Sequence, residues 1–208
     1  MLDHDSCVKT VIDLLGPREI TTELYTDSKK NRIDVALPLR NIAIEVQVSN
    51  MTKKEAVKRT YQLNKDGWYV LWLLEPNMHY IVKNNIQRQA KAIERFLHGI
   101  YYGRVYYISS IDKQIIPVHF ETVETQYYEV EDPHGETYQT TDPYAFGGVS
   151  EGSPGWDFQE SYTYYHKRNK MLKVGSPITT IRFIKKTSTD LPSNEKYKVA
   201  GLNDKRFW

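Results

Sequence analysis

The sequence predicts an α/β domain, with elements in the order αβββαβα around a mixed central sheet, followed by a β-rich C-terminal extension. Apolar residues recur at helical spacing in some stretches and alternate as in strands in others, and turn-forming residues separate these stretches. The 208 residues suffice for a buried core, and 40% hydrophobic with 26% charged residues is typical of a folded globular protein.

The first part of the chain predicts one helix and three strands. The helix is expected over Ser6–Leu15, where apolar residues recur at helical spacing until Gly16 and Pro17 end it. The three strands are rich in β-forming residues or alternate apolar and polar side chains. They are expected over Ile20–Thr26, Arg32–Pro38 and Asn41–Ser49.

The next part predicts a helix, a buried strand and a longer helix. Thr52 and Glu55 have the spacing of a capping box, so a helix is expected from Thr52 to Gly67. Trp68–Leu74 is continuously apolar, as in a strand covered on both faces. A long helix is expected over His79–Leu97 from its apolar spacing. A hairpin formed by 103–109 and 114–120 completes this part.

Charge divides the chain into three parts. Residues 1–120 form the predicted domain. Residues 121–166 contain ten acidic side chains and no Lys or Arg, and residues 167–208 carry 11 basic against three acidic side chains. A basic segment with interleaved aromatic residues suits nucleic acid, whereas the acidic, tyrosine-rich segment suits a solvated excursion, a dimer arm or a cover for the basic groove.

Composition also indicates where the protein works. Cys7 is the single cysteine, so no internal disulfide and no cysteine-rich zinc cluster can form. Met1–Gly16 contains three aspartates where a secretory signal needs a basic start and an apolar stretch, and no run of about 18 apolar residues occurs. We therefore expect an intracellular, cytoplasmic protein without membrane association.

Two carboxylates are expected side by side on adjacent strands. Alternation puts Glu45 and Gln47 on the face opposite Ile44, and an antiparallel neighbour can bring Asp34 beside Glu45. With the carbonyl of Val46, these oxygens suit a hard divalent cation, magnesium better than zinc. The alternative is that both carboxylates are solvent-facing residues of a half-exposed sheet.

Four motifs in this order resemble a known nuclease group. They are "RIDVAL", "AIEVQVS", "EAVKRTYQL" and "GWYVLWLL". The pattern resembles the PD-(D/E)XK nuclease superfamily and, more narrowly, the nuclease domain of CoiA-like competence proteins. The resemblance covers about Asp3–Leu74 and extends toward Phe120 through Gly103 and Arg104. It implies a restriction-endonuclease-like fold with an αβββαβ core.

The resemblance implies roles for four residues of the second and third strands. Asp34 and Glu45 would be metal ligands, with Val46 adding its backbone carbonyl, and the metal would be Mg²⁺ or Mn²⁺. Gln47 would be the third catalytic residue. It stands where the superfamily usually has lysine, and a glutamine offers hydrogen bonds but no positive charge.

Other residues are candidates for completing the site. A resemblance to Holliday-junction resolvases points to Asp5 as a further metal ligand, with His4 and Glu23 as competitors. An acid at this position can also simply stabilise the helix dipole. The residues expected to contact substrate phosphates lie just before the following helix or on its surface: Ser49, Lys58 and Arg59. The alternative is that Ser49 only caps a turn and that the two cations are only solvated.

Three functions are compatible with these features. The first is a metal-dependent deoxyribonuclease, with branched or recombination intermediates as candidate substrates. The second is a catalytically weak DNA-binding or recombination-accessory protein of the same fold, which Gln47 would permit. The third is a protein-interaction module that uses the acidic middle segment. DNA is the expected partner in the first two, and a homodimer is left open.

Overall fold

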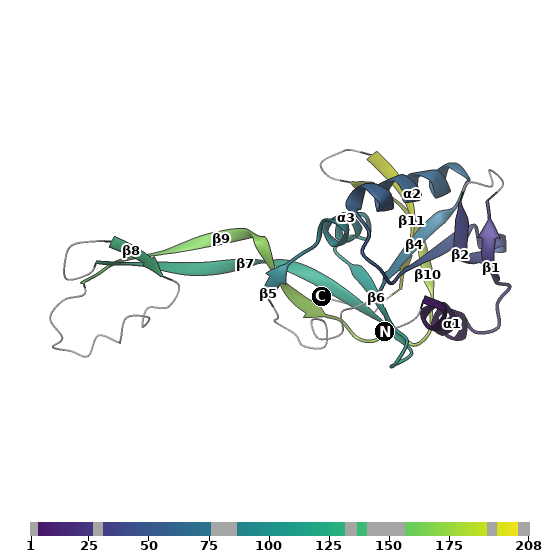
Figure 1. Cartoon of the computed structure of the whole chain (residues 1–208), viewed down its shortest axis with the longest axis horizontal. Coiled ribbons are helices and arrows are strands. Elements are labelled where there is room, and N and C mark those ends of the chain that lie inside the picture. Colours follow the sequence, from purple (N-terminus) through teal and green to yellow (C-terminus); the bar gives the residue numbers. More distant parts are fainter. Residues whose placement is uncertain are drawn as a thin grey trace.

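The computed structural model shows helices packed on one large mixed sheet (Figure 1). Within the part of the chain that it describes, three α-helices accompany an 11-stranded sheet. This confirms the predicted α/β class and the β-rich extension, and the mixture of parallel and antiparallel pairs is consistent with a restriction-endonuclease-like fold. The described residues are 4–26, 31–75, 87–131, 137–140, 157–190 and 195–203.

The first four major elements match the sequence prediction to within two residues at each end. The strands pair in sequence order and antiparallel, as a meander does. Between the last two strands, Asn41 adopts a left-handed conformation with φ of 49°, which asparagine tolerates better than most residues. The elements are α1 (His4–Leu15), β1 (Thr21–Tyr25), β2 (Arg32–Leu37) and β3 (Ile42–Gln47).

The predicted capping box starts helix α2 (Lys53–Lys65). The backbone N–H of Thr52 donates to Glu55 Oε2 at 2.8 Å, and the backbone N–H of Glu55 donates to the Thr52 hydroxyl at 3.2 Å. Strand β4 (Tyr69–Leu74) follows and lies parallel to β3. The crossover through α2 therefore places the carboxyl ends of β3 and β4 at the same edge of the sheet.

Within the described residues, the long helix predicted over His79–Leu97 is right from Ala92 onward and wrong before it. Residues 87–89 form strand β5 (Gln87–Gln89), and helix α3 begins only at Ala92 and ends at Ile100. The physical reason is a new helix start, because the Glu94 carboxylate accepts the backbone N–H of Lys91 at 2.7 Å. Residues 76–86 lie outside the described part of the chain.

The predicted hairpin forms from β6 (Val105–Ser109) and β7 (Gln114–Glu131). Strand β7 continues well beyond the hairpin and pairs antiparallel with β9 (Asp157–Val174), while β8 (Thr137–Thr140) joins β7 near its end. Figure 1 shows this ribbon projecting away from the helices. The proposed division at residue 121 therefore falls inside a continuous strand, and it stays a prediction.

The C-terminal hairpin is built into the central sheet. Strands β10 (Phe183–Asp190) and β11 (Glu195–Leu202) pair antiparallel, and β11 also pairs parallel with β4. Tyr197 and Val199 of β11 are buried in the core. Deleting the whole basic segment would therefore remove part of the core along with its charge.

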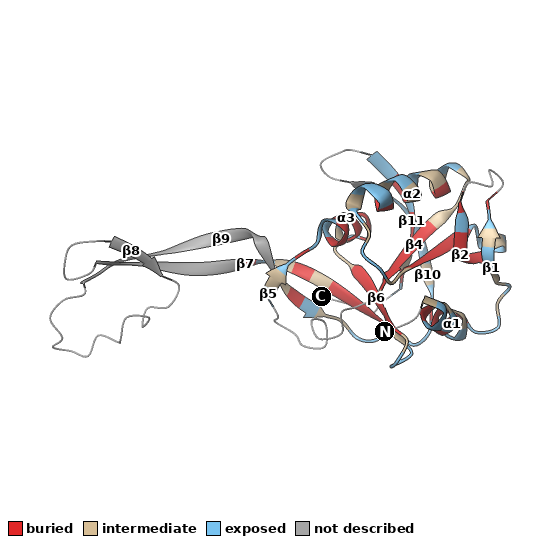
Figure 2. Cartoon of the chain, in the orientation of Figure 1, coloured by how far each residue is buried: buried red, intermediate tan, exposed pale blue. Residues whose placement is uncertain are grey.

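Strands β2, β3, β4 and β6 are buried over most of their length (Figure 2). Helix α1 packs against β2, β3 and β6, whereas α2 packs against β4 and β11. Trp72 of β4 is fully buried, and its indole N–H donates to the Thr60 hydroxyl of α2 at 2.9 Å. The central strands are thus covered on both faces. None of the described helices is long and apolar enough to cross a membrane.

Candidate active site

Strand pairing brings the two predicted carboxylates together. Val35 pairs with Ile44 in the antiparallel register of β2 and β3, and continuing that register by one residue places Asp34 opposite Glu45. Glu45 is only 2% exposed. The alternative reading, a solvent-facing carboxylate on a half-exposed sheet, is therefore wrong for Glu45, which is buried and contacts Arg59 of α2.

Asp34 is held by the backbone of the neighbouring strand. Its Oδ2 accepts the backbone N–H of Val46 at 2.8 Å. The same oxygen lies 3.5 Å from Nε2 of His4, at the start of α1. A hydrogen bond from a rigid strand fixes the carboxylate better than contacts from flexible side chains do, so Asp34 is a preorganised oxygen donor.

Glu45 is paired with a cation from α2. Arg59 Nε donates to Glu45 Oε2 at 2.5 Å, and another nitrogen of the same guanidinium donates to the backbone carbonyl of Arg32. Burial raises the pKa of Glu45 to about 8, although the charge and hydrogen bond of Arg59 act in the opposite direction. The carboxyl group therefore keeps its proton to a higher pH than an exposed glutamate does.

A small cavity of about 220 Å³ lies at this position, and the second oxygen of Glu45 is unsatisfied beside it. Glu45 Oε1 is buried and has no hydrogen-bond partner among the described residues. A buried carboxylate oxygen without a protein partner is usually satisfied by a bound water or an ion. The lining residues are His4, Asp34, Glu45, Val46, Gln47, Val48, Ser49, Met51 and Arg59.

The oxygen donors fit a divalent cation such as Mg²⁺. Mg²⁺ is commonly bound by one or two carboxylates, with waters and substrate phosphates completing its shell. Asp34 and Glu45 provide two carboxylates, and the orphaned Oε1 of Glu45 provides a free lone pair. The described residues contain no group of three or more His, Cys, Asp or Glu side chains that could hold a metal by themselves.

Gln47 is held at the rim of this cavity. Its side-chain amide donates to the backbone carbonyl of Ser49 at 2.8 Å and lies 2.9 Å from the Ser49 hydroxyl. The amide is thus oriented by a short local loop. Gln47 and Ser49 line the same cavity as the carboxylates, in agreement with their predicted neighbourhood.

Comparison with protein-family models matches residues 15–130 to the competence protein CoiA, nuclease-like domain. The matched range is more than half of the chain and includes both carboxylates. The chain belongs to the CoiA nuclease-like family. This confirms the resemblance drawn from the motifs, and the domain's name is consistent with the PD-(D/E)XK nuclease superfamily. A search of curated proteins found no match. A search of solved structures found none either.

Three predicted site residues lie outside the carboxylate cavity of the CoiA nuclease-like domain. The side chain of Asp5 is 92% exposed and lies 3.6 Å from His4. Glu23 pairs with Arg32 at 3.1 Å on the exposed edge of β1. Lys58 is exposed on α2 and lines none of the cavities described here. His4 is therefore the N-terminal side chain that the structure brings to Asp34.

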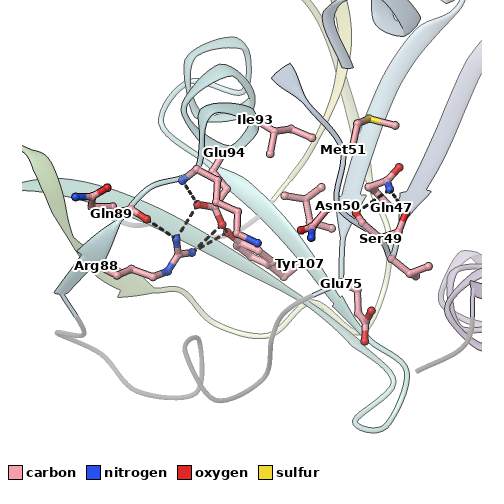
Figure 3. A pocket seen from close by; sticks show the side chains of 13 residues that line it. Gln47, Ser49, Asn50, Met51, Glu75, Arg88, Gln89, Ile93, Glu94 and Tyr107 are labelled. Carbon is pink, nitrogen blue, oxygen red and sulfur yellow. Dashed lines mark hydrogen bonds and ion pairs between the residues drawn. The ribbon is translucent and has the colours of Figure 1, made fainter. Parts of the chain in front are cut away.

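A second, larger cavity adjoins the first. It measures about 810 Å³ and lies between the ends of β3 and β4 on one side and β5 and α3 on the other (Figure 3). On the far side, Arg88 makes two hydrogen bonds to Glu94, and the Tyr107 hydroxyl donates to Glu94 at 2.7 Å. This cluster was not predicted, because the sequence indicated one long helix over His79–Leu97, whereas Arg88 lies in strand β5.

Proposed function

We propose that this CoiA nuclease-like domain is a metal-dependent deoxyribonuclease that hydrolyses phosphodiester bonds. The observation that supports it most is the pair of carboxylates on β2 and β3. Asp34 is fixed by a backbone hydrogen bond, and buried Glu45 has an oxygen without a partner beside the same cavity. Buried carboxylates are costly, so their pairing at a cavity favours a functional role over a structural one.

Asp34 and Glu45 would hold Mg²⁺ or Mn²⁺, with the carbonyl of Val46 as a further donor. Such a cation supplies an acidified water and neutralises charge on a phosphate. Asp34 needs no reorganisation for this role, since Val46 already fixes it. Glu45 has to give up its proton, and the nearby Arg59 guanidinium favours the ionised form.

Gln47 and Arg59 would act on the substrate phosphate. Gln47 stands at the rim of the carboxylate cavity and offers amide hydrogen bonds without positive charge. Arg59 lies in the same cavity and can hydrogen-bond a phosphate when a metal ion replaces it as the partner of Glu45. The missing lysine charge would thus be compensated by an arginine from α2.

DNA is the proposed partner, and a basic surface supports this. Exposed lysines lie on the C-terminal hairpin, which is part of the central sheet. Contacts between such lysines and phosphates do not depend on base sequence. The hairpin lysines with described side chains are Lys185, Lys186, Lys196 and Lys198.

A second candidate function is a DNA-binding accessory protein with weak or no catalysis. Two observations favour it. Arg59 occupies one oxygen of Glu45, and Gln47 replaces the usual lysine. An arginine that stays on Glu45 in the presence of metal would leave a DNA-binding fold with an inactive site.

A gel assay separates the two functions. Plasmid, single-stranded and four-way-junction DNA are incubated with the full chain in Mg²⁺, Mn²⁺ or EDTA. The nuclease proposal expects cleavage with either metal and none in EDTA. Mobility shifts of DNA without cleavage in any metal would instead support the accessory function. The junction lane tests whether branched DNA is the preferred substrate.

A further inference from the structure

The larger cavity is continuous with the carboxylate cavity through shared residues. Gln47, Val48, Ser49 and Met51 line both. The carboxylate cavity, at about 220 Å³, is smaller than the roughly 300–1,000 Å³ typical of small-molecule sites, whereas the larger cavity, at about 810 Å³, lies within that range. A ligand that places a phosphate at the carboxylates can therefore extend another group into the larger cavity.

The charges around the larger cavity balance. Among the described residues that line it, four side chains are charged, two of each sign: Arg88, Lys91, Glu75 and Glu94. Arg88 contacts both oxygens of the buried Glu94, at 2.7 and 2.8 Å. Burial alone would raise the pKa of Glu94, but the hydrogen bonds and charge of Arg88 outweigh it and the pKa is lowered. The two groups thus form a neutral ion pair, and the described lining carries no excess of the positive charge that binds phosphates.

The uncharged side chains of the lining suit a nucleobase. Asn50 and Gln89 are exposed, and among the described residues neither side-chain amide has a hydrogen-bond partner. Met51 and Ile93 add apolar surface, and Figure 3 shows the lining side chains gathered around the hollow. Amide groups pair with the donor and acceptor edges of bases, and apolar surface accommodates their faces.

We propose that this cavity binds an unpaired base of the DNA strand whose phosphate lies at Asp34 and Glu45. The proposal rests on the nuclease function proposed above and adds its substrate class, which is single-stranded or locally unpaired DNA. In a duplex the bases are stacked and paired, and moving one into a protein cavity costs a few kcal/mol, whereas a single strand avoids most of this cost. The site therefore discriminates against continuous duplex.

Binding and cleavage are measured separately on the same oligodeoxynucleotides. Fluorescence anisotropy in Ca²⁺, a divalent cation that carboxylate oxygens also bind, gives the affinity of the full chain for a labelled single strand and for its duplex. Cleavage in Mn²⁺ is followed on the single strand, the duplex and a duplex with a central mismatched region. Gln89→Leu and Asn50→Leu remove the amides, and Gln87→Leu is the matched control, since Gln87 is exposed on the same strand but does not line the cavity.

The wild type is expected to bind the single strand more tightly than the duplex and to cut within mismatches. Gln89→Leu and Asn50→Leu should each weaken single-strand binding by about tenfold, the size of a lost amide–base contact, and Gln87→Leu should leave it unchanged. Circular dichroism verifies that each variant folds.

Two results would overturn this inference. One is equal affinity for single strand and duplex, and the other is an equal effect of the Gln87 and Gln89 substitutions. Both are distinct from failure of the nuclease function. If the protein prefers single strands and Gln89→Leu weakens binding but no DNA is cleaved, the base-binding cavity is supported and the nuclease function is refuted. If DNA is cleaved in a metal-dependent way without a preference for single strands, the nuclease function is supported and the base-binding cavity is refuted.

Discussion

Arg59 Nε lies 2.5 Å from Oε2 of the buried Glu45, so the CoiA nuclease-like domain already carries a positive charge where a catalytic metal would bind. The guanidinium also donates to the backbone carbonyl of Arg32, which anchors α2 to β2. The pair stabilises an acidic group that would otherwise be costly to bury. In the proposed site, Arg59 on Oε2 and a metal at Oε1 would both interact with this carboxylate.

Arg59→Gln is expected to destabilise the protein. The substitution removes the cation that faces Glu45, so the free energy of unfolding at pH 8 should fall by about 1–3 kcal/mol, the cost of leaving a buried polar group unpaired. Urea denaturation in EDTA measures it. Lys58→Gln is the matched control, because Lys58 is exposed one residue earlier on α2, and its effect should stay within about 0.5 kcal/mol. Equal effects would show that the pair contributes little.

Glu45 is expected to make stability depend on pH. Its pKa is raised from 4.5 to about 8 in the folded protein, so the folded state keeps a proton that the unfolded state loses first. The stabilisation is fully present below pH 4.5 and is lost as the pH rises to about 8, with a slope of at most about 1.4 kcal/mol per pH unit.

The comparison is with Glu45→Gln, which cannot ionise. Unfolding free energies in EDTA should fall more steeply between pH 5 and 8 for the wild type than for the variant. Other titrating groups contribute equally to both proteins, so the difference between the two curves isolates Glu45. Parallel curves would contradict the raised pKa.

Gln47→Lys is expected to keep or raise the cleavage rate in Mn²⁺. Gln47 lines the carboxylate cavity, and a lysine there adds a positive charge near the phosphate. Its ammonium group can still donate to the backbone carbonyl of Ser49, which now accepts from the amide. Single-turnover cleavage of a labelled oligonucleotide measures the rate. A large loss of rate with unchanged DNA affinity would indicate that the reaction requires the glutamine amide itself.

The basic hairpin is expected to contribute to DNA affinity without affecting the core. Lys196 and Lys198 are exposed on β11, while Tyr197 between them is buried. The double substitution Lys196→Gln and Lys198→Gln should reduce the dependence of log affinity on log salt by about 0.9 per lost phosphate contact on duplex DNA. Anisotropy at several salt concentrations measures this slope. An unchanged slope would place the DNA elsewhere on the surface.

Local sequence signals predicted the elements that carry the carboxylates. The alternation in β2 and β3 placed Asp34 and Glu45 together, and Thr52 with Glu55 marked the start of α2. These signals are short-range, and the backbone geometry of strands and helix caps follows from them directly.

Contacts between distant segments were not predictable in this way. The pairing of β11 with β4 joins Val199 to Val70, and no local pattern specifies it. The apolar spacing around Arg88 resembled a helix, but its ion pair with Glu94 and the pairing of β5 with β9 hold it in a strand. Tertiary contacts thus outweighed helical periodicity at the larger cavity.

Cleavage of DNA by Asp34→Asn in Mn²⁺, measured beside the wild type, tests the proposed active site most directly. The variant keeps an oxygen that can accept the Val46 N–H, so the fold should persist, and circular dichroism verifies it. The nuclease proposal predicts wild-type cleavage that needs Mn²⁺, loss of cleavage by at least about 100-fold in the variant, and weaker Mn²⁺ binding by calorimetry. Cleavage by Asp34→Asn at the wild-type rate would contradict the proposed active site.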